Sequence, residues 1–358
     1  MTVSIPTQRI ASSRVDEIDL ENPDFDLGFG DMFSDHMFQM DYSDGAWRDP
    51  RIVPYGPFAI EPGALCLHYG QAVFEGLKAF RGEDGMIRVF RPDRNFSRLE
   101  RSCQRLCIPT FDRETFLDAI DSLVRIDRNW IPSKRGQALY IRPLVVATES
   151  NLNVRPAREY RFFIMTSPVR EYFTGGTVAL KAERRYTRSA PGGMGYAKTA
   201  GNYAASLLPG SESQQLGHDQ VLWLDGLEHR YVEEVGQMNI FFKIDGKVLT
   251  PDLHGTILPG VTRESVIDIL RDEGVAVEEC RIDINDILKA HENGSLEEAF
   301  GAGTAAVIAP VGCIRIDDTD ITINHAEPGP LAQHLYQRIV DIQRGACDDQ
   351  FGWNRLIE

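Results

Sequence analysis

The glycine-rich stretch GGMGYAKTAGNY, residues 192–203, constrains the fold more than any other feature, because Lys198 within it fits two unrelated architectures. It differs by one residue from the phosphate-binding loop G-x-x-x-x-G-K-[ST], which requires a strand before its glycines and a helix after them. The apolar run VLWLD at 221–225 follows, as a second nucleotide-binding motif would. The alternative is a lysine that attacks a carbonyl group.

The surrounding residues argue against the phosphate-binding loop. The preceding segment RRYTRSAP, residues 184–191, is charged and interrupted by proline, so it does not resemble a buried strand. Ala197 stands in place of the motif's last glycine. That glycine is needed because it lets the backbone wrap around the phosphate. VLWLD runs into Asp225-Gly226, which is typical of a hairpin turn. A nucleotide-binding protein is therefore disfavoured.

A second glycine motif, GAGTAA at 301–306, matches the dinucleotide pattern G-x-G-x-x-[GA]. That pattern should follow a strand and open a helix. Here SLEEAF, residues 295–300, predicts a helix before it, and AAVIAPV, residues 305–311, predicts a strand after it. We therefore interpret it as a turn whose amides could hold an anion. A nicotinamide dehydrogenase is disfavoured.

Length and charge exclude further classes. The 358 residues favour two domains. A net charge of -15 argues against nucleic acid and against an anionic membrane surface. No apolar run reaches the roughly 18 residues of a membrane span, and the N-terminus has no apolar signal region. The six cysteines form no C-x-x-C pair, so the sequence predicts no metal site and favours a reducing cytoplasm.

The pattern of elements predicts a mixed α/β (α+β) fold. A polar tail covers 1–25, and the PVREYFTGG segment at 168–176 is interpreted as a linker between domains 1–167 and 177–358. The first domain should contain a hairpin at 79–90, helices at 94–107 and 114–127, and strands at 139–147 and 160–169. The second should contain a strand from Val178, strands at 220–224, 229–232 and 239–243, and helices at 261–272 and 331–343.

Lys198 gains significance from the residues that accompany it. A lone lysine in a glycine-rich segment is ordinarily a solvated surface residue. Tyr203 follows in KTAGNY, Glu234 lies in EEVGQMNIFF, and a helix start, LPGVTRES, precedes the GAGTAA turn. An imine-forming lysine, an acid for a pyridine nitrogen and anion-binding turns together describe a site for pyridoxal 5'-phosphate.

At these residues the chain resembles the branched-chain amino acid aminotransferases of the class IV (fold type IV) pyridoxal-phosphate family. The resemblance extends from about Phe29 to Val311, with order and spacing agreeing, through GFGDMFSDHM, LHYGQAVFEGLKAFRG, VFRPDRN, LYIRPLV, GYAKTAGNY, DQVLWLDG, EEVGQMNIFF, GTILPGVTRES and GAGTAAVIAP. It implies a small N-terminal α/β domain, a larger C-terminal domain around a β pseudo-barrel, and a cofactor between them. It also implies a homodimer, and reversible ping-pong transfer of an amino group between leucine, isoleucine or valine and 2-oxoglutarate.

The resemblance assigns the cofactor residues. Lys198 would form the imine and shuttle a proton, Glu234 would keep the pyridine nitrogen protonated, and Tyr203 would bind the phenolic oxygen. The motif E-V-G-x-M-N selects Glu234 over its neighbour Glu233. The phosphate would be bound by Arg91, Val261, Thr262 and Thr304.

The resemblance also implies a substrate pocket that is apolar and carries one cation. Arg142 would pair with the second carboxylate of glutamate or 2-oxoglutarate, and the amides of Thr304 and Ala305 would bind the α-carboxylate. Leu152 and Val154 would come from the partner subunit. The remaining expected pocket residues are Phe29, Tyr69, Phe74, Tyr140 and Gln237.

Two departures from the family pattern concern regulation and substrate preference. Ala306 and Ala309 stand where some members carry a redox-sensitive C-x-x-C, and Gln237 stands where several have threonine. Two other fold type IV activities remain as alternatives, a D-amino acid aminotransferase and a 4-amino-4-deoxychorismate lyase. The chain length and the pair Tyr140-x-Arg142 argue against both.

Overall fold

The computed structural model describes residues 5–20, 22, 26–170 and 176–358, and it divides into two compact units. Unit 1 contains the described residues of Met1–Glu171 together with Ala197–Ala200 and Asp341–Glu358. Unit 2 contains those of Tyr172–Tyr196 and Gly201–Val340. Two short segments from the second half of the chain, one of them carrying Lys198, therefore belong to unit 1.

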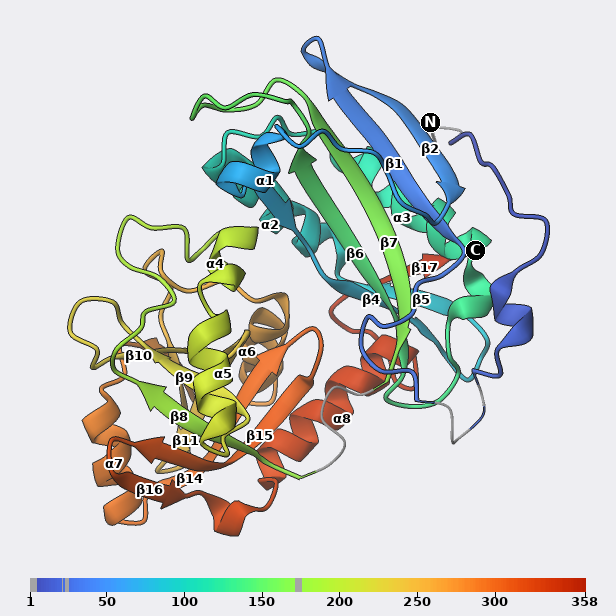
Figure 1. The fold of residues 1–358 in the computed structure, drawn as a ribbon. Coiled ribbons are helices and arrows are strands. Elements are labelled where there is room, and N and C mark those ends of the chain that lie inside the picture. The colour runs from blue at the N-terminus through green and yellow to red at the C-terminus, as the bar shows by residue number, and fades with distance from the viewer. Residues whose placement is uncertain (1–4, 21, 23–25, 171–175) are drawn as a thin grey trace. The chain divides into compact units, whose positions relative to one another are not determined.

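Unit 1 is built on an eight-stranded antiparallel sheet (Figure 1). The strand order is β17-β5-β4-β6-β7-β1-β2, and β3 pairs with β6. The strands are β1 (His36–Ser43), β2 (Ala46–Pro54), β3 (Ala72–Phe74), β4 (Leu77–Arg81), β5 (Ile87–Phe90), β6 (Ala138–Ala147), β7 (Tyr160–Val169) and β17 (Asn354–Ile357). Strand β17, near the C-terminus, is thus an edge strand of a sheet whose other strands come from the first half of the chain.

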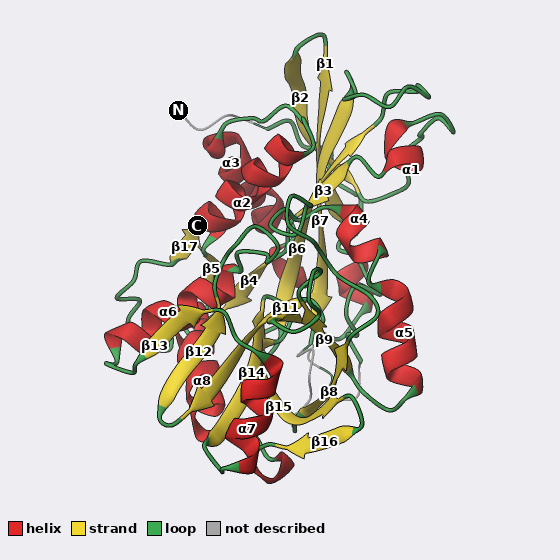
Figure 2. Cartoon of the chain, turned by 90° about the vertical axis from the view of Figure 1, so that its left-hand side faces the viewer, coloured by secondary structure: helices red, strands yellow, loops and turns green. Residues whose placement is uncertain are grey.

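Figure 2 shows α2 (Pro92–Arg105) and α3 (Arg113–Ile126) on the same side of this sheet. Pro92 occupies the first turn of α2, and the Asp112 carboxylate caps α3 by accepting the Thr115 N–H at 2.7 Å. The helices bury an apolar stripe, including Leu99 and Phe116, against the strands. The shorter helices of this unit are η1 (Arg14–Glu17), α1 (Leu65–Tyr69) and η2 (Arg128–Trp130).

Unit 2 is built around a closed barrel of six strands in the order β8-β9-β10-β11-β14-β15, in which β15 pairs back with β8. Strands β12, β13 and β16 extend the same sheet to nine strands. The bounds are β8 (Val178–Glu183), β9 (Gln220–Leu224), β10 (Val232–Val235), β11 (Met238–Ile244), β12 (Lys247–Pro251), β13 (Val277–Cys280), β14 (Leu296–Gly303), β15 (Val307–Ile316) and β16 (Thr319–Thr322). This barrel confirms the expected fold class.

The helices of unit 2 follow the barrel. They are α5 (Leu207–Gln215), α6 (Val261–Asp272), α7 (Ile284–Glu292) and η3 (Asn324–Ala326). Two helices span the unit boundaries, α4 (Ala200–Ala204) and α8 (Pro330–Arg344). Figure 2 shows α5 beside β8 and β9. Within the described part of the chain, no helix combines the length and the apolar character that crossing a membrane requires.

Elements with strong local signals lie where the sequence predicts them. The hairpin of β4 and β5 turns at Asp84-Gly85, where Gly85 has a φ of 75°. Helix α6 coincides with the predicted helix at 261–272, and Gly274 follows it at a φ of 72°. Backbone values of this kind favour glycine, which explains why these boundaries could be recognised.

The prediction of a helix at SLEEAF is wrong, because these residues form most of β14. The strand pairs with β11, for example Phe300 with Phe241. The buried carboxylate of Glu298 accepts the backbone N–H groups of Leu331 and Ala332 at 3.0 Å, in the first turn of α8. These long-range contacts outweigh a short helical pattern. The first three residues of GAGTAA therefore end β14, and the last three form the turn to β15, so a strand and not a helix follows.

A second correction concerns the strand predicted at 229–232, which begins only at Val232 as β10. The Asp225 carboxylate accepts four backbone N–H groups, from residues 227, 228, 230 and 231. These bonds hold a turn longer than a two-residue hairpin, and His229 adopts a φ of 47° within it. The strand can start only after the turn.

The segment before Lys198 also differs from a phosphate-binding loop. Strand β8 ends at Glu183, and residues 184–198, all of which are described, contain no helix or strand. The predicted linker at 168–176 begins inside β7, which includes Pro168 and Val169, while 171–175 lie outside the described residues. The domain boundaries at 167 and 177 therefore remain a prediction.

Candidate active site

Lys198 is fixed in unit 1 by its backbone. Its carbonyl accepts the N–H of Phe74 at 3.0 Å, and its own N–H donates to Ser102 Oγ at 2.8 Å. A bridge between Thr199 and Val73 continues the pairing along β3. The Nζ atom lies 4.8 Å from the centre of the Phe74 ring, within cation–π range.

A buried carboxylate, Glu75, stands next to this segment. It accepts bonds from Arg98 Nε at 2.7 Å and Asn95 Nδ2 at 2.8 Å, and it is fully buried. Burial raises its pKa, but the charges of Arg98 and Lys198 and the bonds from Arg98 and Asn95 together hold the pKa below its ordinary value. The charged form of Glu75 is therefore favoured, in part by the charge of Lys198, and no sequence motif pointed to this residue.

Phe29, Phe74, Tyr140 and Arg142, four of the predicted substrate residues, line one cavity of about 360 Å³ in unit 1. Phe29 and Tyr140 pack edge to face at 5.0 Å between ring centres. Arg142 donates to Tyr140 Oη at 3.2 Å, and its guanidinium lies 5.0 Å from the Phe74 ring centre. Its buried Nε has no hydrogen-bond partner among the described residues. The cavity thus combines aromatic walls with an available cationic donor.

Sequence reasoning missed other residues of this cavity. They are Gly30, Phe33, Leu144, Met165, Thr166 and Ser167. Those on β6 and β7 read as ordinary core residues of a strand. Phe33 belongs to GFGDMFSDHM, so the motif contained a signal for it.

Tyr69, Leu152 and Val154 lie elsewhere in unit 1 and do not line the cavity. Tyr69 Oη donates to the carbonyl of Leu152 at 2.6 Å. All three are exposed, Val154 by 83%. Arg91 is the N-cap residue before α2, with a φ of 47°; it is buried, and its guanidinium lies 4.8 Å from the ring centre of Trp353.

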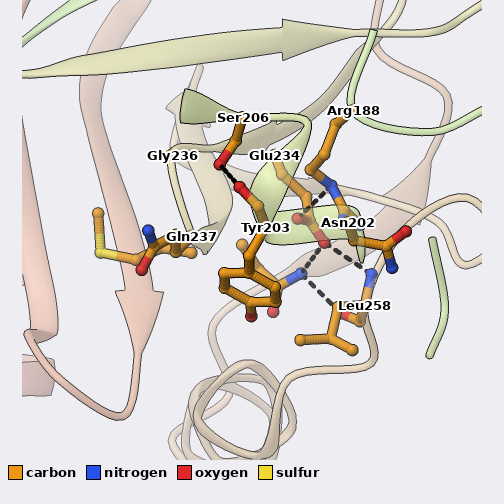
Figure 3. Close-up of a pocket in the computed structure, with 10 residues that line it drawn as sticks. Arg188, Asn202, Tyr203, Ser206, Glu234, Gly236, Gln237 and Leu258 are labelled. Atoms are coloured by element: carbon orange, nitrogen blue, oxygen red, sulfur yellow. Dashed lines mark hydrogen bonds and ion pairs between the residues drawn. The ribbon is translucent and has the colours of Figure 1, made fainter. Parts of the chain in front are cut away.

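In unit 2, Glu234, Tyr203 and Gln237 line a second, smaller pocket (Figure 3). Glu234 Oε2 forms an ion pair with Arg188 Nε at 2.7 Å, and Oε1 accepts the Leu258 N–H at 2.6 Å. Arg188 is a further residue that sequence reasoning missed, because it stands in a segment whose charges resemble those of a solvated loop. These contacts hold the carboxylate of Glu234 in one orientation.

Glu233 has a different environment from Glu234. It does not line this pocket, and its Oε1 accepts from Thr256 Oγ1 at 2.6 Å. Burial raises its pKa, although the Thr256 bond lowers it in part. The pairing of β9 and β10 is irregular between Val232 and Glu234, and the two carboxylates of Glu233 and Glu234 have different hydrogen-bond partners.

The predicted anion-binding residues of unit 2 occupy a helix start and a turn. Val261 and Thr262 begin α6, whose N-cap is Gly260, with no side-chain capping bond. Thr304 and Ala305 lie in the turn between β14 and β15. Uncapped amides at a helix N-terminus favour an anion.

Residues 72–314 match the family model described as amino-transferase class IV. The chain is 51% identical over 338 residues to a "Probable branched-chain-amino-acid aminotransferase" of Staphylococcus epidermidis, which covers 93% of this chain and 94% of that protein. It is 50% identical over 334 residues to "Branched-chain-amino-acid aminotransferase 2" of Bacillus subtilis, covering 92% of each chain. The chain therefore belongs to the class IV aminotransferase family and is an aminotransferase.

Solved structures agree with this assignment. The Escherichia coli branched-chain amino acid aminotransferase superposes with a TM-score of 0.75 at 25% identity, covering 90% of this chain and 99% of that one. The branched-chain amino acid aminotransferase from Thermobaculum terrenum, "in PLP-form (holo-form)", has a TM-score of 0.73 at 25% identity, covering 90% of this chain and 98% of that one. The resemblance seen in the sequence is confirmed.

Proposed function

We propose that this protein is a branched-chain amino acid aminotransferase, which exchanges the amino group of leucine, isoleucine or valine for the oxo group of 2-oxoglutarate. The observation that carries the proposal is the cavity of about 360 Å³, whose aromatic walls suit a branched side chain. Arg142, the cation among its described lining residues, has a buried Nε available for the second carboxylate of glutamate or 2-oxoglutarate. The relatives named above carry the same activity in their names.

The residues present fit pyridoxal 5'-phosphate as the cofactor, which the Thermobaculum terrenum relative holds in its PLP form. Lys198 has an amine that can bond the aldehyde, and the fixed carboxylate of Glu234 suits a protonated pyridine nitrogen. Tyr203, in the Glu234 pocket, would bind the phenolic oxygen. The uncapped start of α6 suits a phosphate. The phosphate group would be held by Arg91, Val261, Thr262 and Thr304.

When bound, this cofactor withdraws electrons from the substrate's Cα–H bond. Lys198 Nζ would be the base that takes the proton from the substrate's Cα, and the buried Glu75 carboxylate interacts with the charge of Lys198. Glu234 would bind the protonated ring nitrogen, and Arg188 holds the Glu234 carboxylate through their ion pair.

The substrate is oriented by its two ends. The amides of Thr304 and Ala305 would bind the α-carboxylate, while Phe29, Phe74 and Tyr140 contact the side chain. Tyr69 and Gln237 are the other two substrate residues that the resemblance implies; Gln237 lines the Glu234 pocket of unit 2, and Tyr69 is exposed in unit 1. In a homodimer, the exposed Leu152 and Val154 would reach the partner's pocket, and their exposure in the single chain supports this arrangement. Sedimentation of the purified protein tests the dimer. The six free cysteines suit the cytoplasm.

The decisive experiment is an absorption spectrum of the purified protein followed by addition of L-leucine. We expect a visible cofactor band that leucine bleaches and 2-oxoglutarate restores. D-alanine and 4-amino-4-deoxychorismate, tested in parallel, should leave the band unchanged. A colourless protein, or a band that only D-alanine bleaches, would overturn the proposal.

A further inference from the structure

The N-terminal segment Ile5–Ile18, which we term the strap, is attached to the sheet of unit 1. Thr7 forms a parallel bridge with Ile52 of β2, the Gln8 N–H donates to the Ile52 carbonyl at 2.9 Å, and the Ile52 N–H donates to Pro6 at 2.9 Å. In Figure 1 this segment runs beside β2. In the sequence, this segment is part of the polar tail predicted at 1–25.

The strap contacts one buried carboxylate, that of Asp35, which is 4% exposed. Asp35 Oδ1 accepts from both the backbone N–H and Nε of Arg14 at 3.2 Å, and Oδ2 accepts from Ser13 Oγ. Trp130 Nε1 also donates to Asp35 Oδ2, at 2.8 Å. A buried carboxylate with this many donors has one defined position.

Arg14 also contacts the backbone that carries the cavity wall. Its Nη2 donates to the carbonyls of Phe33 at 3.0 Å and Ser34 at 2.6 Å. The Ser34 N–H in turn donates to the Thr166 carbonyl at 2.8 Å, and the two hydroxyl groups are hydrogen-bonded. Phe33 and Thr166 both line the cavity, so one arginine joins the strap directly to that wall.

The wall itself has little regular structure to hold it. Residues 27–34 precede β1 and form no helix or strand, and Gly28 and Gly30 adopt φ values of 59° and 84°. Phe33 stacks on Tyr55 at 4.8 Å between ring centres. A loop of this kind opens at low free-energy cost unless side-chain contacts fix it.

We propose that the strap is a positioning element for the substrate pocket and that Arg14 and Asp35 are its positioning residues. The inference rests on the proposed function, since it assigns the cavity to substrate. Arg14 fixes Phe33 and the loop 29–34 before substrate arrives, so that the branched side chain meets a preformed wall. Neither Arg14 nor Asp35 lines the cavity, and both act through the loop.

Arg14→Ala tests this, with Arg9→Ala as the matched control, because Arg9 is an exposed arginine of the same strap. Losing the charge-assisted bonds of Arg14 should raise KM for L-leucine about tenfold while kcat changes little, since binding is weakened equally in ground and transition states. Hydrogen exchange across 29–35 should quicken in the same variant. Arg14→Lys can keep one side-chain bond to Asp35, so its KM for L-leucine should lie between the values of Arg14→Ala and the unmodified enzyme. Arg9→Ala should leave KM and exchange unchanged.

A KM within about twofold of the unmodified enzyme in Arg14→Ala would overturn the proposal, as would an equal change in Arg9→Ala. Unaltered hydrogen exchange across 29–35 would do the same. Failure of the unmodified enzyme to act on leucine would instead overturn the proposed function. The exchange measurement would still show whether the strap holds the loop, so the two failures are distinguishable.

Discussion

Arg188 and Glu234 form a buried ion pair in unit 2, with 2.7 Å between Arg188 Nε and Glu234 Oε2. The guanidinium is itself held by the carbonyls of Gly195 and Thr256, each at 3.0 Å from Nη2. A buried carboxylate that loses its cationic partner becomes an uncompensated charge. The arginine therefore fixes the direction of the carboxylate that is proposed to bind the ring nitrogen of the cofactor.

Arg188→Ala should lower the free energy of unfolding by about 3–5 kcal/mol, because it removes the cation that compensates the buried charge of Glu234. The control is Lys289→Ala, which breaks an exposed pair with Asp286 and should cost less than about 1 kcal/mol. Urea denaturation of both variants measures the difference. Equal losses would show that Arg188 does not hold a buried charge.

Glu234→Gln should lose far more in kcat than in cofactor binding. A neutral amide cannot keep the ring nitrogen protonated, so the loss falls on an interaction made in the transition state. Cofactor absorbance and turnover of the same preparation supply the two quantities. Glu233→Gln is the control and should turn over near normally, because Glu233 lies outside the pocket. Near-normal turnover in Glu234→Gln would contradict its assigned role.

Borohydride reduction of the coloured protein should fix the cofactor on Lys198, as found by peptide mapping. The backbone of Lys198 is held by Phe74 and Ser102, so its position does not depend on the cofactor. Lys198→Ala should retain weak cofactor binding through the phosphate contacts and should not turn over. A label on Lys78 or any other lysine would exclude the assignment.

Cys103 and Cys107 should differ sharply in reactivity. Burial raises the pKa of Cys103 to about 12, with a smaller contribution from the charge of Glu100, whereas Cys107 is exposed. Because the thiolate is the nucleophile, iodoacetamide at about pH 8.5 should modify Cys107 first and leave Cys103 intact in the folded protein. Mass spectrometry of timed samples tests the order. Simultaneous modification would mean that the core of unit 1 opens under these conditions.

Sequence signals predicted those features that are encoded locally. Proline and glycine marked α6, and Asp84-Gly85 marked a hairpin, because both depend on backbone preferences of a few residues. SLEEAF was misassigned because Glu298 is buried by contacts with Leu331 and Ala332, which are distant in the chain. A short pattern carries no information on such partners.

The candidate site shows the same division. Motifs pointed to Lys198 and Glu234 as candidates, which remain predictions, but not to Arg188. Three arginines share its segment, and only the fold pairs this one with Glu234. Thr166 read as a core residue for the same reason. Which residues of a strand face a cavity depends on the register of its neighbours, and here Tyr140 pairs with Ser167 across β6 and β7.

Arg142→Ala tests how one pocket accepts both an apolar and an acidic side chain. Alternation places Tyr140 and Arg142 on one face of β6, where Tyr140 Oη accepts from Arg142 and the arginine's Nε remains without a hydrogen-bond partner among the described residues. Removing one partner of a buried charge pair costs about 2–5 kcal/mol, and a pocket that admits water should lie at the lower end. We therefore expect kcat/KM for 2-oxoglutarate to fall roughly 30-fold.

The half-reaction with L-leucine should change far less, because leucine has no second carboxylate for Arg142 to bind. Single-turnover measurements of both half-reactions, followed through the cofactor absorbance, compare the two directly. Arg161→Ala is the control, since Arg161 lies on the adjacent strand β7, pairs with Asp41 at 2.6 Å and does not line the cavity. It should slow both half-reactions equally or not at all. If Arg142→Ala slows the half-reactions with leucine and with 2-oxoglutarate by the same factor, Arg142 is a structural residue. Selectivity for the second carboxylate must then come from another part of the pocket.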